Sequence, residues 1–333
     1  MGATIRRVTE SNSGSGRRSL RVFLHMRWNT PILLATLLCA CISLPAQDLR
    51  PAAREPNPPE PTPPPPTDTE NRNLLDRVIA NQKRDDVAQF TYERLERQEI
   101  RKGVGGVQPP EIKVARAVPA GTGVDRIPVG PDGKPQDANA YRAELEKLER
   151  SLEWAVQEGR AQREAYDKIA KKQKERSDLI DATRSAFLYT FVAREPRGDS
   201  ILAKYRMEPN PAYKGTSRAT SMFGKVHGYL WIDEAAAQLA RVEVEVMEDI
   251  SLGGFLAKIY KGSHLVQERY EIAPGIWLPT YAQYDFDGRK FWMSFGIHEK
   301  TFYSQYRRIG PPKEALQAIR AELGKSDTAR ADP

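Results

Sequence analysis

Two kinds of hydrophobic spacing divide this chain of 333 residues. Over residues 68–85, apolar side chains recur every three or four positions, which predicts an amphipathic helix. From residue 187 to residue 309 the period changes to two, and intervals rich in Gly, Pro and Asp separate the apolar runs. Over residues 241–247, for example, valines alternate with charged residues. We therefore expect successive antiparallel strands joined by tight turns, because no helical pattern lies between them.

Shorter strands are expected before this region. Residues 90–100 alternate and predict a first strand, and residues 111–129 predict a pair of strands. The segment 131–133 (Pro-Asp-Gly) predicts a turn, because Pro presets the first turn angle and Gly tolerates positive φ.

Residues 137–186 form the most helix-like part of the chain. They contain no Pro, a single Gly at position 159, and many Glu, Lys and Arg residues. Their apolar stripe is thin, which predicts one long charged helix that is exposed along much of its length. A solvated arm is the simpler interpretation, and a partner-binding coiled coil is the alternative. A last helix is expected over residues 312–323, followed by a charged, disordered tail.

The first 46 residues have the pattern of an export signal. Residues 31–44 carry no charge and follow Arg27, so a positive segment precedes a short apolar one. Fourteen residues are too few to cross a bilayer, since a helix needs about 20 to span ~30 Å. Met26 is a candidate for the true start. We expect the protein to be exported from the cytoplasm.

Two processing routes remain open. Residues 38–41 (Leu-Cys-Ala-Cys) resemble a bacterial lipobox, in which Cys41 would carry the lipid and anchor the protein in the outer membrane. Alternatively, cleavage after Ala46 would leave a periplasmic protein that begins at Gln47. The Pro-rich linker at residues 47–69 predicts a semi-rigid spacer, which suits an anchored domain.

The distribution of charge and of cysteine excludes several classes of protein. The formal net charge is +7, but the six Arg and one Glu of residues 1–46 account for +5 of it. A nucleic-acid-binding protein would carry its positive charge on the folded part, so we expect no nucleic-acid partner. Both cysteines, Cys39 and Cys41, lie in the leader, and the chain has four His. We therefore expect no disulfide framework, no metal site and no cofactor downstream.

No constellation of catalytic residues is present either. The chain has no phosphate loop, dinucleotide fingerprint or nucleophile motif. His227, His264 and His298 fall on separate predicted strands, where packing within a sheet is the expected role. Asp233 ends a strand and suits an Asx-type turn. The sequence thus predicts a protein that is not an enzyme.

Two segments carry a family resemblance. Residues 228–233 (GYLWID) and the alternating strand at residues 239–246 resemble the central hairpin of LolA-like periplasmic lipoprotein carriers, of RseB regulators and of outer membrane lipoprotein-sorting proteins. Residues 270–279 (YEIAPGIWLP) are similar to the strand-turn-strand that follows it there. The resemblance covers roughly residues 70–310 and is strongest over 187–309, with residues 137–186 as a helical insertion.

The resemblance implies an α+β fold in which a curved antiparallel sheet forms an incomplete, unclosed β-barrel, with helices on its concave side. An apolar concavity of this kind can hold the acyl chains of a lipid or lipoprotein, because burial stabilises by roughly 0.8 kcal/mol per methylene. The residues expected to line it are Leu230, Ile232, Val242, Val244 and Val246. In the alternative, these residues fill a closed core, and the protein is an envelope scaffold or sensor whose charged helix binds a protein partner.

The mature N-terminus separates the two processing routes. We expect an unlipidated chain that begins at Gln47, because Cys39 and Ile42 are unusual in a lipobox. Cys41→Ser should then leave the protein in the soluble fraction, where it already lies. Mass spectrometry of the purified protein tests this. A diacylglyceryl group on Cys41, with release from membranes in the Cys41→Ser variant, would contradict the expectation.

Overall fold

A computed structural model of the protein describes residues 64–252 and 257–331. The predicted export signal, Cys41 and most of the Pro-rich linker lie outside the described residues. The first helix, α2 (Asp68–Ala88), begins within the expected linker. A capping box fixes this start, since the Thr67 hydroxyl accepts from the Glu70 N–H and the Glu70 carboxylate accepts from the Thr67 N–H.

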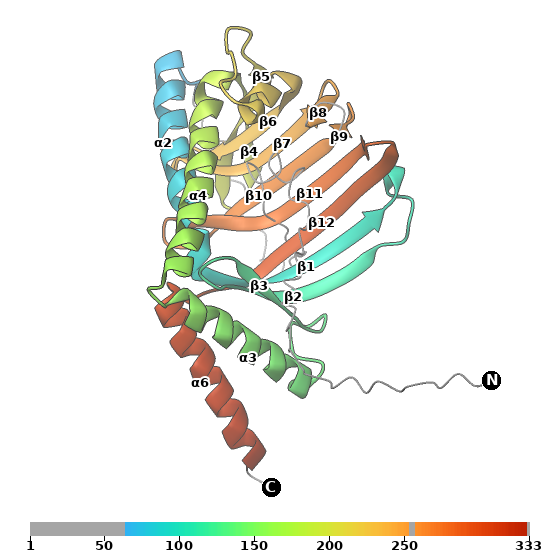
Figure 1. Ribbon diagram of the computed structural model, residues 1–333. Coiled ribbons are helices and arrows are strands. Elements are labelled where there is room, and N and C mark those ends of the chain that lie inside the picture. Colours follow the sequence, from blue (N-terminus) through green and yellow to red (C-terminus); the bar gives the residue numbers. More distant parts are fainter. Residues whose placement is uncertain (1–63, 253–256, 332–333) are drawn as a thin grey trace, which may run out of the picture.

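A single sheet of twelve strands forms the body of the protein (Figure 1). Each hydrogen-bonded pair is antiparallel, and the main path runs β3-β2-β1-β12-β11-β10-β7-β6-β5-β4. The strands are β1 (Tyr92–Lys102), β2 (Glu111–Pro119), β3 (Val124–Pro128), β4 (Phe187–Arg197), β5 (Ser200–Pro209), β6 (Val226–Asp233), β7 (Gln238–Val246), β8 (Ile250–Leu252), β9 (Ala257–Ile259), β10 (His264–Ala273), β11 (Ile276–Lys290) and β12 (Met293–Arg308).

The sheet does not close on itself. Its terminal strands, β3 and β4, each have one strand neighbour, and β8 and β9 attach beside β11. The expected meander is present, and β1–β3 extend it by pairing β1 with the last strand. The predicted fold class, an unclosed antiparallel sheet with helices, is confirmed.

Two helices cover the inner face of the sheet. Helix α2 and helix α4 (Arg160–Ala186) lie side by side along it (Figure 1). Leu74 and Val78 of α2 and Leu179 of α4 are buried in the main core against strands β4–β7 and β9–β11. On the solvent side two exposed ion pairs join the helices: Lys83 to Asp181 at 2.6 Å, and Arg184 to Asp76 at 2.7 Å.

The prediction of one long helix over residues 137–186 is wrong. The segment contains two helices, α3 (Ala138–Ala155) and α4, separated at residues 156–159. Asp137 caps α3 through bonds from two backbone N–H groups, and Gly159 takes an extended conformation just before α4. The break lets the two helices pack on different parts of the sheet.

Helix α3 is not an exposed arm. Its leucines Leu145, Leu148 and Leu152 are 0–2% exposed and form a second core with β2, β3 and helix α6 (Pro312–Ala331). This core explains the thin stripe, because a helix that packs on one side against another helix and a sheet edge needs only a narrow apolar face. Helix α6 also continues past residue 323, where the disordered tail was expected to begin.

Short helical turns complete the described chain. They are the α-helical turn α5 (Arg218–Ser221) and the 3₁₀ turns η1 (Gln89–Thr91), η2 (Val104–Gly106) and η3 (Met222–Lys225). Within residues 64–252 and 257–331, no helix is long and apolar enough to cross a membrane.

The second core can be tested by one pair of substitutions. Leu148→Ala should lower the free energy of unfolding by about 2–5 kcal/mol, because it leaves a cavity between α3 and α6. Lys147→Ala, one residue earlier and exposed, should change it by less than about 0.5 kcal/mol. Urea unfolding monitored by circular dichroism measures both. Equal effects would mean that α3 does not pack as described.

Candidate binding site: an apolar pocket under two helices

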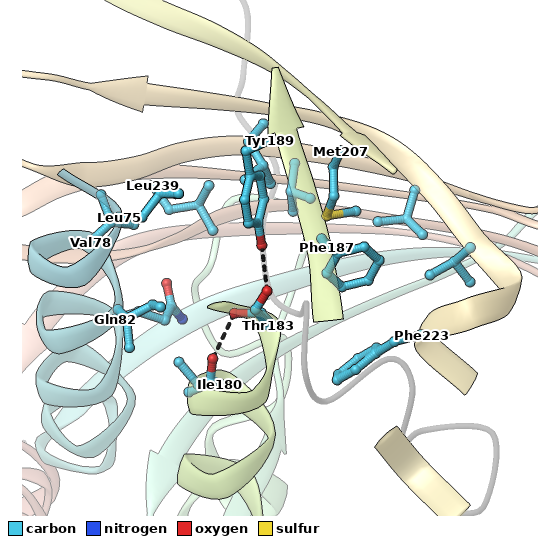
Figure 2. A pocket seen from close by; sticks show the side chains of 15 residues that line it. Leu75, Val78, Gln82, Ile180, Thr183, Phe187, Tyr189, Met207, Phe223 and Leu239 are labelled. Carbon is cyan, nitrogen blue, oxygen red and sulfur yellow. Dashed lines mark hydrogen bonds between the residues drawn. The ribbon is translucent and has the colours of Figure 1, made fainter. Parts of the chain in front are cut away.

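A pocket lies between α2, α4 and the inner face of the sheet (Figure 2). The helices contribute one wall, and strands β4–β7 with the turn η3 contribute the other. Its lining is almost wholly apolar: Leu75, Val78, Ile79, Gln82, Ile180, Thr183, Phe187, Tyr189, Met207, Phe223, Val226, Leu230, Leu239, Val242 and Val244. Aliphatic and aromatic side chains from seven elements therefore converge on one space.

Only three polar side chains line this pocket, and two of them are already hydrogen-bonded. The Tyr189 hydroxyl donates to the Thr183 carbonyl at 2.9 Å, and the Thr183 hydroxyl donates to the Ile180 carbonyl at 2.6 Å (Figure 2). Burial raises the pKa of Tyr189 well above its ordinary value, so this phenol stays neutral. Gln82 Oε1 is buried without a hydrogen-bond partner. The pocket thus holds no charge that could pair with a charged ligand group.

The pocket is small in this conformation. Its cavity volume is about 100 Å³, less than the ~150 Å³ of an engineered apolar cavity that binds benzene. A few methylene groups fit in it, but a whole acyl chain does not. A longer apolar ligand needs more space than this conformation provides.

A buried charged cluster adjoins the pocket beyond Gln82. Asp85 is fully buried, accepts from the Trp277 N–H at 3.2 Å and lies 3.7 Å from Arg269. Asp86 pairs with Arg176 of α4, and desolvation raises the pKa of Asp86 against the opposing effect of Arg176 and Arg269. Since each of these carboxylates has a cationic partner, the cluster joins α2 to the sheet and to α4.

A second, larger cleft is polar. It lies between β1, β12 and α6, with a volume of about 710 Å³. Its main charges neutralise one another: Arg116 pairs with Glu93 at 2.7 Å and with Glu322 at 2.8 Å, and Arg307 also pairs with Glu93. These ion pairs attach α6 to the sheet. With its charges paired internally, the cleft is a weaker candidate for a ligand site than the apolar pocket.

The five residues that the sequence predicted as ligand-lining all face the main core. Leu230, Val242 and Val244 line the pocket. Ile232 and Val246 belong to the same core but do not contribute to the pocket wall. The alternation of β6 and β7 therefore identified the correct face of the sheet, while the extent of the pocket along that face depends on where the helices lie.

The pocket residues on α4, β4, β5 and η3 were not predicted as ligand-lining from the sequence. Phe187 and Tyr189 alternate along β4, and Met207 follows on β5, so period-two spacing was available as a signal. Ile180 is one of few apolar residues in a highly charged helix. Nothing local in the chain shows that these side chains meet those of α2.

The polar residues noted in the sequence have structural surroundings. Asp233 accepts the N–H of Ala236, three residues on, at 2.9 Å, so its carboxylate caps the turn after β6, although an Asx turn would have its bond two residues on. His227 lies 3.7 Å from Glu245, and His298 lies 3.1 Å from both Asp285 and Asp287. Among the residues that the structure describes, no group of three or more His, Cys, Asp and Glu side chains could hold a metal ion.

Comparisons with known proteins gave structural neighbours only. No family model and no curated protein matches the chain. A LolA superfamily protein from Nitrosomonas europaea aligns at 10% identity and a TM-score of 0.27, covering 74% of this chain and 96% of its own. A domain of an outer membrane lipoprotein-sorting protein from Vibrio parahaemolyticus aligns at 10% identity and a TM-score of 0.29, covering 70% and 92%.

A DUF1329 family protein from Desulfovibrio piger also aligns, at 11% identity and a TM-score of 0.26, covering 71% of this chain and 93% of its own. TM-scores this low leave the function of this chain to be inferred from its own pocket.

The inward face of β7 can be tested directly. Val244→Asp should lower the free energy of unfolding by several kcal/mol, because Val244 is 4% exposed and the new carboxylate would have no partner there. Glu245→Lys should be nearly silent, since this side chain is half exposed. Thermal melting of both variants gives the answer, and equal melting temperatures would contradict the assignment of faces.

Proposed function

We propose that this chain is an exported binding protein of the cell envelope that holds an acyl chain of a lipid or lipoprotein in the pocket under α2 and α4. Binding is non-covalent and involves no chemical step. The observation that supports this most is the pocket lining, which is apolar apart from two hydroxyls that are bonded internally and one glutamine.

The chemistry of the lining favours an acyl chain over other ligands. A charged or strongly polar group would lose its hydration in the pocket and find no partner of opposite charge there, which costs free energy. A hydrocarbon chain loses only contact with water, and each buried methylene stabilises the complex by roughly 0.8 kcal/mol. Gln82 lies where the apolar pocket meets the buried charged cluster.

Entry of a whole chain requires the helix pair to open. On their solvent side α2 and α4 are joined by the exposed pairs Lys83–Asp181 and Arg184–Asp76. Exposed ion pairs are worth only about 0–1 kcal/mol each, so these two oppose opening weakly. The remaining resistance is the apolar contact of the helices with the sheet, which a bound acyl chain would replace, and the buried charged cluster that joins Asp85 to Arg269 and Asp86 to Arg176.

The small volume of the closed pocket favours one alternative. In this second candidate function the core stays closed, and the protein acts as an envelope scaffold or sensor that binds a protein partner through the charged surface of α4. The two functions differ in whether lipid binds to the pocket at all.

Binding of radiolabelled palmitate to the delipidated full chain tests the proposal. We compare Leu239→Trp, which fills the pocket from β7, with Leu188→Trp, a control on β4 that is 50% exposed and outside the pocket. Leu239→Trp should weaken binding roughly tenfold or more, because the indole occupies the space of several methylenes. Leu188→Trp should leave the affinity unchanged.

Circular dichroism confirms that both variants are folded before binding is compared. Absence of palmitate binding to the wild-type chain would overturn the proposal and favour the scaffold or sensor. Equal affinity of the wild type and Leu239→Trp would show that the chain binds lipid elsewhere, and would also overturn the assignment of the pocket.

A further inference from the structure

Exposed apolar side chains gather at one edge of the sheet, away from the pocket. The turn between β11 and β12 carries Trp292, which is 88% exposed, and Met293, which is 59% exposed. The η2 segment between β1 and β2 carries Val104 and Val107, which are 49% and 80% exposed. We call these four residues, together with Phe291, the tip patch.

The β11–β12 hairpin extends past the end of β10 and lies beside the short strand β9. The last pair between β10 and β11 joins His264 to Asp285, and β11 continues for five further residues before the turn. Along this extension the short strand β9 pairs with Gly288–Lys290, and β8 pairs with β9. The turn therefore lies at the edge of the sheet, with β9 paired to β11 up to its last residue (Figure 1).

The two residues of this turn are uncommon in two-residue β-hairpin loops. Lys290 pairs with Met293, so Phe291 and Trp292 form a two-residue loop, where Asn and Gly are strongly preferred. Phe291 has φ of +54°, a left-handed conformation that is unfavourable for a bulky side chain. Its ring lies 5.7 Å from that of Trp292. The strained backbone at Phe291 costs stability and the exposed Trp292 adds none, which points to a role of the aromatic pair outside the fold.

The η2 segment is fixed beside this hairpin. The Gly105 N–H donates to Asp287 Oδ1 at 2.9 Å, which ties η2 to β11. A Cβ at Gly296 of β12 would lie 2.1 Å from the Gly103 carbonyl oxygen, so the η2 backbone packs directly against β12. The valines of η2 and the aromatic residues of the hairpin thus belong to one edge of the sheet (Figure 1).

Basic residues outnumber acidic ones at the edge that carries the tip patch. Residues 100–113 and 286–297, which form this edge, contain five Lys and Arg but only two Asp and Glu, Glu111 and Asp287. Arg289 is exposed next to the hairpin turn, and Arg101 is exposed at the end of β1. Lys102 and Lys113 pair with Glu111 at 2.8 and 3.0 Å, which leaves the two exposed arginines as the main positive charges of this edge. An apolar tip with exposed arginines nearby matches the chemistry of an anionic bilayer, where Trp prefers the interface and Lys and Arg meet the lipid phosphates.

We propose that the tip patch docks this protein on the surface of a membrane that contains anionic lipids, with Trp292 and Met293 inserted at the interface. The docking does not depend on whether the pocket holds an acyl chain, so it goes beyond the proposed function. Insertion would bury the side chains that water now contacts, while the basic residues would lie near the headgroups.

Vesicle flotation of the full chain tests the proposal, with vesicles of phosphatidylcholine alone or with added phosphatidylglycerol. The double variant Trp292→Ser/Met293→Ser should lower partitioning onto anionic vesicles roughly tenfold or more. Ile201→Ser is the matched control, because Ile201 is 61% exposed but lies at the opposite end of the strands, beside the β4–β5 turn. The N-terminal leader is the same in each protein, so its contribution cancels.

Two further measurements separate the parts of the proposal. Brominated phosphatidylcholine in the anionic vesicles should quench the fluorescence of the wild type more than that of Trp292→Phe, since the bromines lie in the acyl region. Arg289→Gln/Lys290→Gln should weaken binding to anionic vesicles and reduce its dependence on salt.

Each contrary result would overturn the docking. The docking would be wrong if the Trp292→Ser/Met293→Ser variant bound anionic vesicles as well as the wild type does. It would also be wrong if Ile201→Ser lost as much vesicle binding as that variant, or if the wild type bound neutral vesicles as strongly as anionic ones. None of these would affect palmitate binding in the pocket, so failure here leaves the proposed function standing. A protein that binds palmitate but no vesicle would point to a protein partner at the tip patch.

Discussion

The structure depends on covering the inner face of a sheet that does not close. The terminal strands β3 and β4 do not pair with each other, so the apolar residues of the inner face cannot be buried by completing a barrel. Helices must bury them instead. Helices α2 and α4 do so over β4–β7, while α3 and α6 form a separate core with β2 and β3. The break at residues 156–159 is what allows one charged segment to serve both cores.

This arrangement also explains the pocket. Helices α2 and α4 contact the curved sheet along only part of their length. The space left between the helices and the sheet is lined by the side chains on the inner face of the strands. Here the lining is apolar, and the nearby charges of Asp85, Asp86, Arg176 and Arg269 are paired with one another. The polar cleft beside α6 shows the contrast. It is larger, but its charges form ion pairs that hold the fold together, so volume alone does not identify a binding site.

Apolar side chains are buried in the pocket but exposed at the tip patch. In the pocket, side chains such as Val242 and Val244 are buried and stabilise the fold whether or not a ligand is bound. At the tip, Trp292 contributes nothing to a core, and Phe291 adopts a strained backbone conformation. The proposed membrane contact would bury the exposed side chains of the tip patch. An acyl-binding pocket and a membrane-docking edge on one sheet would bring the protein to the surface from which an acyl chain is drawn.

Local sequence determined much of this fold. Alternation along residues 241–247 gave the inward face of β7 correctly, and the apolar stripe of residues 68–85 marked the helix that covers it. These features could be predicted because side-chain direction in a strand or helix follows from its period. The motifs at residues 228–233 and 239–246 indicated the class of fold.

Tertiary structure decided what lies against each face. Periodicity shows that Leu148 is on an apolar stripe, but only the packing of α6 shows that this stripe is buried. Likewise, Leu230 and Ile232 have the same spacing and the same face, yet α2 and α4 leave space beside Leu230 alone. Ile180 and Phe187 enter the pocket from distant parts of the chain. The physical reason is that period and composition are local properties, whereas a cavity is defined by the gap between elements that only the folded chain brings together.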